Sequence, residues 1–195
     1  MDGSLIMPVV INGSGTVTGI SVGGLPNGIV DTDMIASSVP LGVTEFDAWR
    51  INTNFSNSAG SNIINAGWER CDRNYDKIGT GLTESSGIFT FPATGKYLVN
   101  LFWYAAGNND RYIGAYIQFS TDSGSNYLDI SDSLDNAYEG GSGTYSSSTC
   151  SALLDVTNAS TCRMRFEATS VGTCTYQGQT DISRTGFTCM RVGGT

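Results

Sequence analysis

The sequence predicts an all-β protein, a jelly-roll β-sandwich of about eight antiparallel strands preceded by an extended Gly-rich N-terminal arm. Three observations carry this prediction. Apolar and polar residues alternate with a period of two along several stretches, turn residues separate these stretches, and 25 of the 195 residues are Gly. We place the arm at residues 1–43 and the jelly-roll head at residues 44–195.

The arm differs in composition from the head, because no Lys or Arg precedes Arg50 and the first aromatic residue is Phe46. Its short β-branched runs are separated by Gly and Asn-Gly turns, and they bury too little apolar surface to offset the cost of ordering the backbone. We therefore expect the arm to dock on a partner or to intertwine with other copies; a disordered tail is the alternative. The expected anchor residues are Val9, Val10, Ile11, Val17, Ile20, Val22 and Leu25.

The head begins with a helix-start signal at residues 44–47, but the segment is too short for a helix. The alternation of Trp49, Ile51, Thr53 and Phe55 with polar residues instead favours a strand over residues 49–55. Alternation and turn signals predict the remaining strands at residues 87–91, 96–104, 113–119, 152–156, 163–168 and 186–192.

Residues 96–104 are apolar on both faces, which is typical of a central strand. One face carries Tyr97, Val99, Leu101 and Trp103, and the other carries Leu98, Phe102 and Tyr104. Both faces cannot point into one sandwich interior, so we expect the second to pack against another subunit. Its coverage by a neighbouring loop is the alternative.

The charge excludes several functions. Ten Lys and Arg stand against 18 Asp and Glu, which gives a net charge of −8, and there is no His. A negative chain is disfavoured on nucleic acid and on anionic membranes. Without His there is no Ser-His-Asp triad and no imidazole base, so we do not expect an enzyme. The start at Met1-Asp2-Gly3 lacks a basic signal-peptide region and no apolar run reaches ~18 residues, so we expect no membrane insertion.

We expect no metal and no cofactor. The cysteines are odd in number and form no Cys-x-x-Cys motif, so buried reduced thiols are expected, with disulfides among Cys150, Cys162 and Cys174 as the alternative. The acidic residues 129–135 could offer oxygens to Ca²⁺ but lack the Gly and Glu of a helix-loop-helix calcium site, which favours a solvated turn. Carboxylate pairs such as Glu84 with Asp76, or Glu139 with Asp135, have nothing in the sequence that brings them to a cleft.

Residues 121–149 combine Tyr with small polar residues, which is the composition of antibody binding loops. We interpret this segment as a candidate ligand-binding loop for a host surface glycan; a hairpin at residues 123–125 followed by an ordinary surface loop is the alternative. The expected contacts are Tyr127, Asp135, Asn136, Tyr138, Glu139 and Tyr145.

Several segments resemble trimeric jelly-roll domains of the tumour-necrosis-factor and complement globular-head type, especially the versions in virion proteins of tailed bacteriophages. In the head these segments are residues 49–51, 87–99, 119–127 and 185–193, and in the arm residues 19–28 resemble phage fibre stems. The resemblance implies a homotrimer whose aromatic strand faces pack around a three-fold axis. The residues that it places at this trimer interface are Tyr97, Val99, Leu101, Trp103, Tyr112 and Tyr116.

Together these expectations predict a structural virion protein. We expect it to assemble in the bacterial cytoplasm and to dock on another virion protein through residues 1–43. Two roles remain open. One is a capsid decoration or head-fibre protein, which the shortness of the arm favours because ~40 residues reach at most ~140 Å when fully extended. The other is a short tail fibre that presents the head to host glycans with three-fold avidity.

Overall fold

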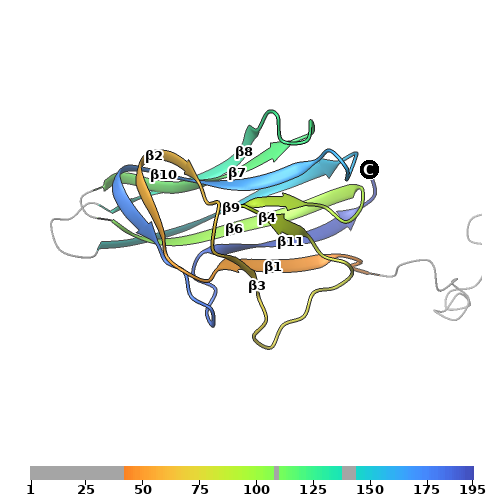
Figure 1. Ribbon diagram of the computed structural model, residues 1–195, viewed down its shortest axis with the longest axis horizontal. Coiled ribbons are helices and arrows are strands. Elements are labelled where there is room, and N and C mark those ends of the chain that lie inside the picture. Colours follow the sequence, from red (N-terminus) through yellow and green to blue (C-terminus); the bar gives the residue numbers. More distant parts are fainter. Residues whose placement is uncertain (1–41, 108–109, 138–143) are drawn as a thin grey trace, which may run out of the picture. The chain divides into compact units, whose positions relative to one another are not determined.

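The computed structural model describes residues 42–107, 110–137 and 144–195, and its compact head unit is Gly42–Thr195 (Figure 1). The predicted anchor residues of the arm lie outside the described residues, as do Tyr138 and Glu139. The described part of the chain contains strands and turns but no helix. It therefore holds no helix that is long and apolar enough to cross a membrane.

Eleven strands form the described head, where the sequence predicts about eight. In chain order they are β1 (Phe46–Ile51), β2 (Phe55–Ile63), β3 (Trp68–Arg70), β4 (Thr83–Ser85), β5 (Ile88–Thr90), β6 (Gly95–Gly107), β7 (Asp110–Ser120), β8 (Leu128–Ala137), β9 (Thr144–Val156), β10 (Arg163–Tyr176) and β11 (Gly186–Gly193).

The strands pair antiparallel in two layers. The first layer has the order β3-β1-β11-β6-β9, and the second has β7 and β8 on one side of β10 and β2 and β5 on the other. The end of β10 also pairs with β6 through Thr175 and Tyr176, so the two layers are joined. Figure 1 shows β2 (orange) and β10 (blue) curving together at this end of the head.

The core lies between the two layers. The predicted inward residues of β7 and β10 are confirmed, because Ile113, Ala115, Ile117, Met164, Phe166 and Ala168 are all fully buried. At its centre Phe89, Phe166, Phe187 and Trp68 form an aromatic cluster in which ring centroids lie 4.5 to 5.7 Å apart. Such edge-to-face and tilted contacts are favourable beyond the area that they bury.

Two predicted elements differ from the structure. The single strand over residues 49–55 is wrong, because β1 ends at Ile51 and Asn52 donates its backbone N–H to Gly67 O at 2.8 Å before β2 begins. The long loop over residues 121–149 is also wrong, because β8 and the first half of β9 occupy most of it. The hairpin turn at residues 123–125 is confirmed, with Ser123 and Gly124 in the left-handed region at φ 65° and 88°.

The cysteines are free thiols, as expected. Cys150, Cys162, Cys174 and Cys189 are buried and Cys71 is partly buried. Burial, with smaller contributions from Asp47 and Glu45, raises the pKa of the Cys189 thiol, which keeps it protonated at neutral pH.

Candidate subunit interface

Strand β6 separates the two apolar faces that the sequence describes. Tyr97, Val99, Leu101 and Trp103 are at most 1% exposed within the single chain, so their predicted place at the trimer interface is wrong. They point between the layers, where the Trp103 indole N–H donates to Ser133 Oγ of β8 at 2.8 Å. The opposite face of β6, with Leu98, Phe102 and Tyr104, points away from the sandwich interior and remains partly exposed.

The outward side of the first layer carries an apolar row that crosses four strands. The strand register aligns Phe46 of β1, Met190 of β11, Leu98 of β6 and Leu153 of β9. Leu153 is 58% exposed and the other three side chains are partly exposed. A cross-strand row of this kind forms a flat apolar surface. At Leu153 no other part of the described chain covers it.

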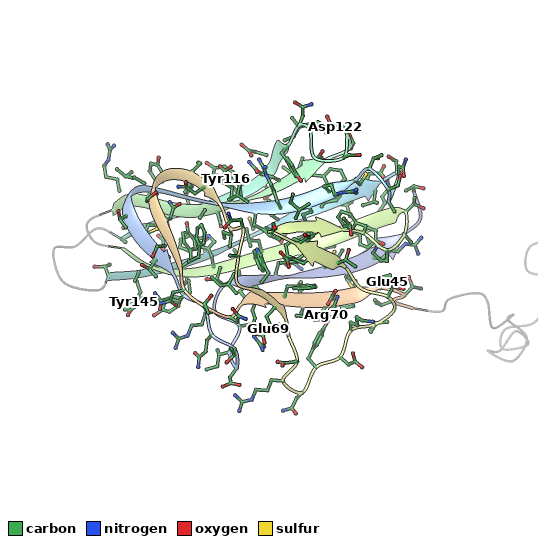
Figure 2. All side chains as sticks on the ribbon, in the orientation of Figure 1. Glu45, Glu69, Arg70, Tyr116, Asp122 and Tyr145 are labelled. Carbon is green, nitrogen blue, oxygen red and sulfur yellow. The ribbon has the colours of Figure 1, made fainter. Side chains whose placement is uncertain are left out.

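Polar and aromatic residues continue this surface along the strands. Beside the apolar row, Ser151 Oγ donates to Asn100 Oδ1 at 2.7 Å, and Asn100 Nδ2 donates to Thr188 Oγ1 at 3.4 Å. Farther along, the rings of Tyr104 and Tyr145 stack with centroids 5.1 Å apart, and Tyr145 is labelled in Figure 2. We define the outer face as Phe46, Leu98, Phe102, Tyr104, Tyr145, Leu153 and Met190.

A second set of exposed apolar residues lies on β8, at the margin of the second layer. Leu128, Ile130 and Leu134 are 69%, 42% and 50% exposed, and we define these three residues as the edge strip. The edge strip was not expected from the sequence, because three Asp residues in the same segment favoured a solvated loop. Even spacing of Leu128, Ile130 and Leu134 does not place them on one face, because the pairing of β8 with β7 shifts its register between Ile117 and Gln118. Leu128 lies opposite Phe119 and Leu134 opposite Gly114, on opposite faces of the edge strand.

The other two predicted interface residues belong to a different surface. Tyr112 is 39% exposed and Tyr116 is partly exposed, and both lie on β7 of the second layer. Tyr116 is labelled in Figure 2. Burial raises the pKa of Tyr116, and the carboxylates of Asp132, Asp129 and Glu167 raise it further. Tyr112 and Tyr116 therefore stay a prediction, separate from the outer face of the first layer.

The structure does not gather the predicted glycan contacts into one loop. Asp135 and Asn136 are exposed on β8, and Tyr145 lies on β9 beside them, because Ser146 Oγ donates to Asn136 O at 2.5 Å. Tyr127 lies at the other end of β8, roughly 30 Å away at ~3.3 Å per residue. Its ring stacks on the Arg165 guanidinium at 3.8 Å. A single site that joins Tyr127 to Asp135, Asn136 and Tyr145 is therefore wrong.

Several of the carboxylates considered for metal binding or hydrolysis lie on β-strands. Residues 129–135 belong to β8 rather than to a loop, and Glu84 accepts the Gly87 backbone N–H at 2.7 Å in the β4–β5 hairpin. No group of three or more metal-ligating side chains occurs among residues 42–107, 110–137 and 144–195.

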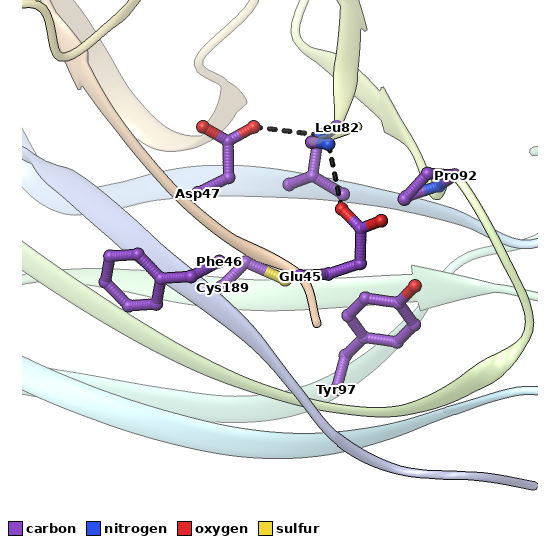
Figure 3. A pocket seen from close by; sticks show the side chains of 8 residues that line it. Glu45, Phe46, Asp47, Leu82, Pro92, Tyr97 and Cys189 are labelled. Atoms are coloured by element: carbon purple, nitrogen blue, oxygen red, sulfur yellow. Dashed lines mark hydrogen bonds between the residues drawn. The ribbon is translucent and has the colours of Figure 1, made fainter. Parts of the chain in front are cut away.

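Buried charges instead tie the 70–82 segment to β1. Asp47, 2% exposed, accepts from Arg70 Nε at 2.9 Å. It also accepts from the Leu82 backbone N–H at 2.8 Å, and Glu45 accepts the Gly81 N–H at 2.9 Å (Figure 3). Arg70 and Glu45 are labelled in Figure 2. The space between these groups and Tyr97 measures about 10 Å³, which holds at most one water. This region is therefore structural rather than a ligand site.

The fold has close counterparts among solved structures. The Eiger TNF structure from S. frugiperda superposes with a TM-score of 0.62 at 13% identity, over 79% of this chain and 96% of that one. Murine APRIL at pH 5.0 superposes with a TM-score of 0.57 at 9% identity, over 76% of this chain and 98% of that one. The head is a TNF-like jelly roll. Neither the protein-family models nor the curated protein sequences give a match to the chain.

Proposed function

We propose that the chain is a non-enzymatic structural protein of a tailed-phage virion, a homotrimer whose TNF-like head is carried by residues 44–195 and whose arm, residues 1–43, docks on another virion protein. The observation that carries the self-association is the outer face. An apolar row across four strands is larger than the scattered hydrophobic residues of an ordinary surface, and such patches mark interfaces.

The edge strip supports a ring of copies. The outer face and the edge strip are two different sets of exposed apolar residues on one chain, and strands β8 and β9 that carry parts of them lie next to each other. A head-to-tail contact between two unlike surfaces closes into a ring when the rotation allows it. Three copies, each covering the outer face of the next with its edge strip, would bury both surfaces.

The virion location is supported by the sequence. The segments at residues 87–99 and 185–193 resemble phage versions of this fold, and residues 19–28 resemble fibre stems. The absence of His and the low fraction of charged residues, 14%, suit a protein whose function is assembly rather than catalysis. Capsid decoration or a head fibre is the proposed role.

Two measurements test this proposal. Light scattering on the full chain is expected to give a mass three times that of the 20.6 kDa chain. A chain that stays monomeric at micromolar concentration would remove the proposed trimer. Quantitative mass spectrometry of purified virions, with immunogold labelling, is expected to find many copies spread over the capsid shell.

A receptor-binding tail fibre is the second candidate function. It is favoured by a polar groove along β2 on the second layer. The virion measurement separates the two roles, because a few trimers confined to the tail would favour the fibre and contradict decoration.

A further inference from the structure

A polar groove lies along β2, on the second layer and away from the outer face. It has a volume of about 490 Å³, within the range of small-molecule sites. The lining residues come from β2, the segment after it, and β10: Phe55, Ser56, Ser58, Ser61, Asn62, Ile63, Asn65 and Glu167.

A bend in β2 shapes this groove. Ala59 and Gly60 both have left-handed backbone, at φ 51° and 73°, in the middle of the strand. The pairing with β10 shifts its register at the same place, between Ser170 and Thr173. A bulge of this kind bends a strand and redirects its side chains, and it costs free energy when a residue other than Gly takes positive φ.

A buried hydrogen-bond network holds the bend in place. Asn57 is fully buried; its amide donates to Gly60 O at 3.0 Å and to Ser170 Oγ at 2.6 Å. Its carbonyl oxygen accepts from Asn62 Nδ2, a groove residue, at 2.7 Å. Ser170 Oγ in turn donates to Gly172 O at 2.7 Å. Because every member of this network is paired, the groove is formed before any ligand arrives.

The lining chemistry selects the kind of ligand. Ser56, Ser58 and Asn65 are exposed, so their hydroxyl and amide groups face solvent as both donors and acceptors. Glu167 adds a carboxylate, of which Oε2 already accepts from Gln118 Nε2 at 3.1 Å and Oε1 remains as an acceptor. Phe55 closes one end of the groove, with its ring packed against the core and 6.4 Å from that of Tyr176. None of the eight lining residues is Lys or Arg, so an anionic ligand would meet the Glu167 charge without a compensating cation.

We propose that this groove binds a neutral glycan, a hexose or N-acetylhexosamine unit of a cell-surface polysaccharide. Glu167 and Asn65 accept hydrogen bonds from sugar hydroxyls, and the Ser hydroxyls and the Asn65 amide donate to sugar oxygens. The site is complete within one chain. It rests on neither the trimer nor the virion location.

Saturation-transfer NMR on the full chain tests the proposal with methyl glycosides of glucose, galactose, mannose, N-acetylglucosamine and N-acetylgalactosamine, and with methyl glucuronide as an anionic probe. At least one neutral glycoside is expected to show transfer, and glucuronide is expected to show less than glucoside. Glu167→Gln is expected to raise the dissociation constant roughly tenfold, because it removes a charged acceptor. Asn65→Ala is expected to raise it several-fold.

Asn158→Ala is the matched control, because Asn158 is also an exposed Asn but lies in the turn between β9 and β10 and does not line the groove. It is expected to leave binding unchanged. Circular dichroism melting checks that each variant is folded. The proposal is overturned if no neutral glycoside shows transfer, if glucuronide binds best, or if Asn158→Ala weakens binding as much as the two groove variants do.

Discussion

Asp47 is a carboxylate that the chain buries on the first strand of the head, where four donors satisfy it. Arg70 Nε and Nη2 lie 2.9 and 3.1 Å from its two oxygens, and the backbone N–H groups of Leu82 and Ala48 lie at 2.8 and 3.0 Å. We predict that Asp47→Ala lowers the free energy of unfolding by about 3–5 kcal/mol, because it leaves the Arg70 charge and the Leu82 N–H without their partner. Urea denaturation measures this loss.

The control for this prediction is Asp155, which pairs with Lys96 at 2.7 Å on the surface, with side chains 50% and 39% exposed. Asp155→Ala is expected to cost at most about 1 kcal/mol, because solvent screens an exposed pair. Equal losses in the two variants would show that the burial of Asp47 does not govern its contribution.

Tyr97 makes the stability of the head depend on alkaline pH. Burial is the main cause that raises its pKa to about 12, and its hydroxyl donates to Ala93 O at 2.9 Å. The unfolded chain loses this proton near pH 10 while the folded chain keeps it, so stability is full below pH 10 and falls as the pH rises towards 12. Between pH 9 and 11 the free energy of unfolding of the wild type is therefore expected to fall. We predict that this fall is about 1 kcal/mol smaller in Tyr97→Phe, as measured by urea denaturation at each pH. An unchanged pH slope would contradict this assignment.

At the residue scale, the sequence predicts alternation but not which apolar face of a strand is inside. Tyr97 and Leu98 lie on opposite faces of β6, and both faces are apolar. The decision comes from the opposite layer, where Ser133 accepts the Trp103 N–H and fixes that face as the interior. Ser133 lies in a segment whose charges favoured a loop, so the sequence alone could not identify this contact.

At the scale of elements, Gly186 sets how closely β11 approaches β1. A Cβ at this position would lie 2.2 Å from Trp49 O and 2.9 Å from Arg50 Cα, both backbone atoms. We predict that Gly186→Ala lowers the free energy of unfolding by about 1–3 kcal/mol, because the two strands must move apart. Thermal and urea denaturation measure the change.

Gly193 provides the control on the same strand, because nothing lies within 4 Å of an added Cβ there. Gly193→Ala is expected to change the stability by less than about 0.5 kcal/mol. If it destabilises the head as much as Gly186→Ala does, the close approach of β1 is not the cause.

Strands with strong alternation were predictable, and those with polar inner faces were not. In β7 and β10 the apolar residues alternate without interruption and their burial followed the prediction. In β8 the inward residues are Ser131 and Ser133, which fit because small hydroxyls meet Trp103 and Cys150 of the facing layer. The bend of β2 at Ala59 was equally hidden, since it depends on the buried Asn57 network and not on local pattern.

At the scale of the whole molecule, the jelly-roll fold followed from the turn-separated strands and from the resembling segments, and the superposition on Eiger TNF and murine APRIL confirms it. The glycan site did not follow, because its groove brings Ser56 together with Glu167, which lies more than a hundred residues farther along the chain. Only the pairing of β2 with β10 makes these residues neighbours.

The proposed trimer makes stability depend on protein concentration, because association favours the folded state by mass action. We predict that the melting temperature of the full chain rises with concentration, and that Leu153→Asp removes both this dependence and the trimer in sedimentation velocity. Burial of the Leu153 side chain would contribute about 1.5–3 kcal/mol to association. The Asp would remove this contribution and place a charge at every equivalent interface of the trimer. Val171→Asp is the matched control, because Val171 is 38% exposed on β10 of the second layer, and it is expected to remain trimeric. A trimer that survives Leu153→Asp, or one that Val171→Asp dissociates instead, would move the interface away from the outer face.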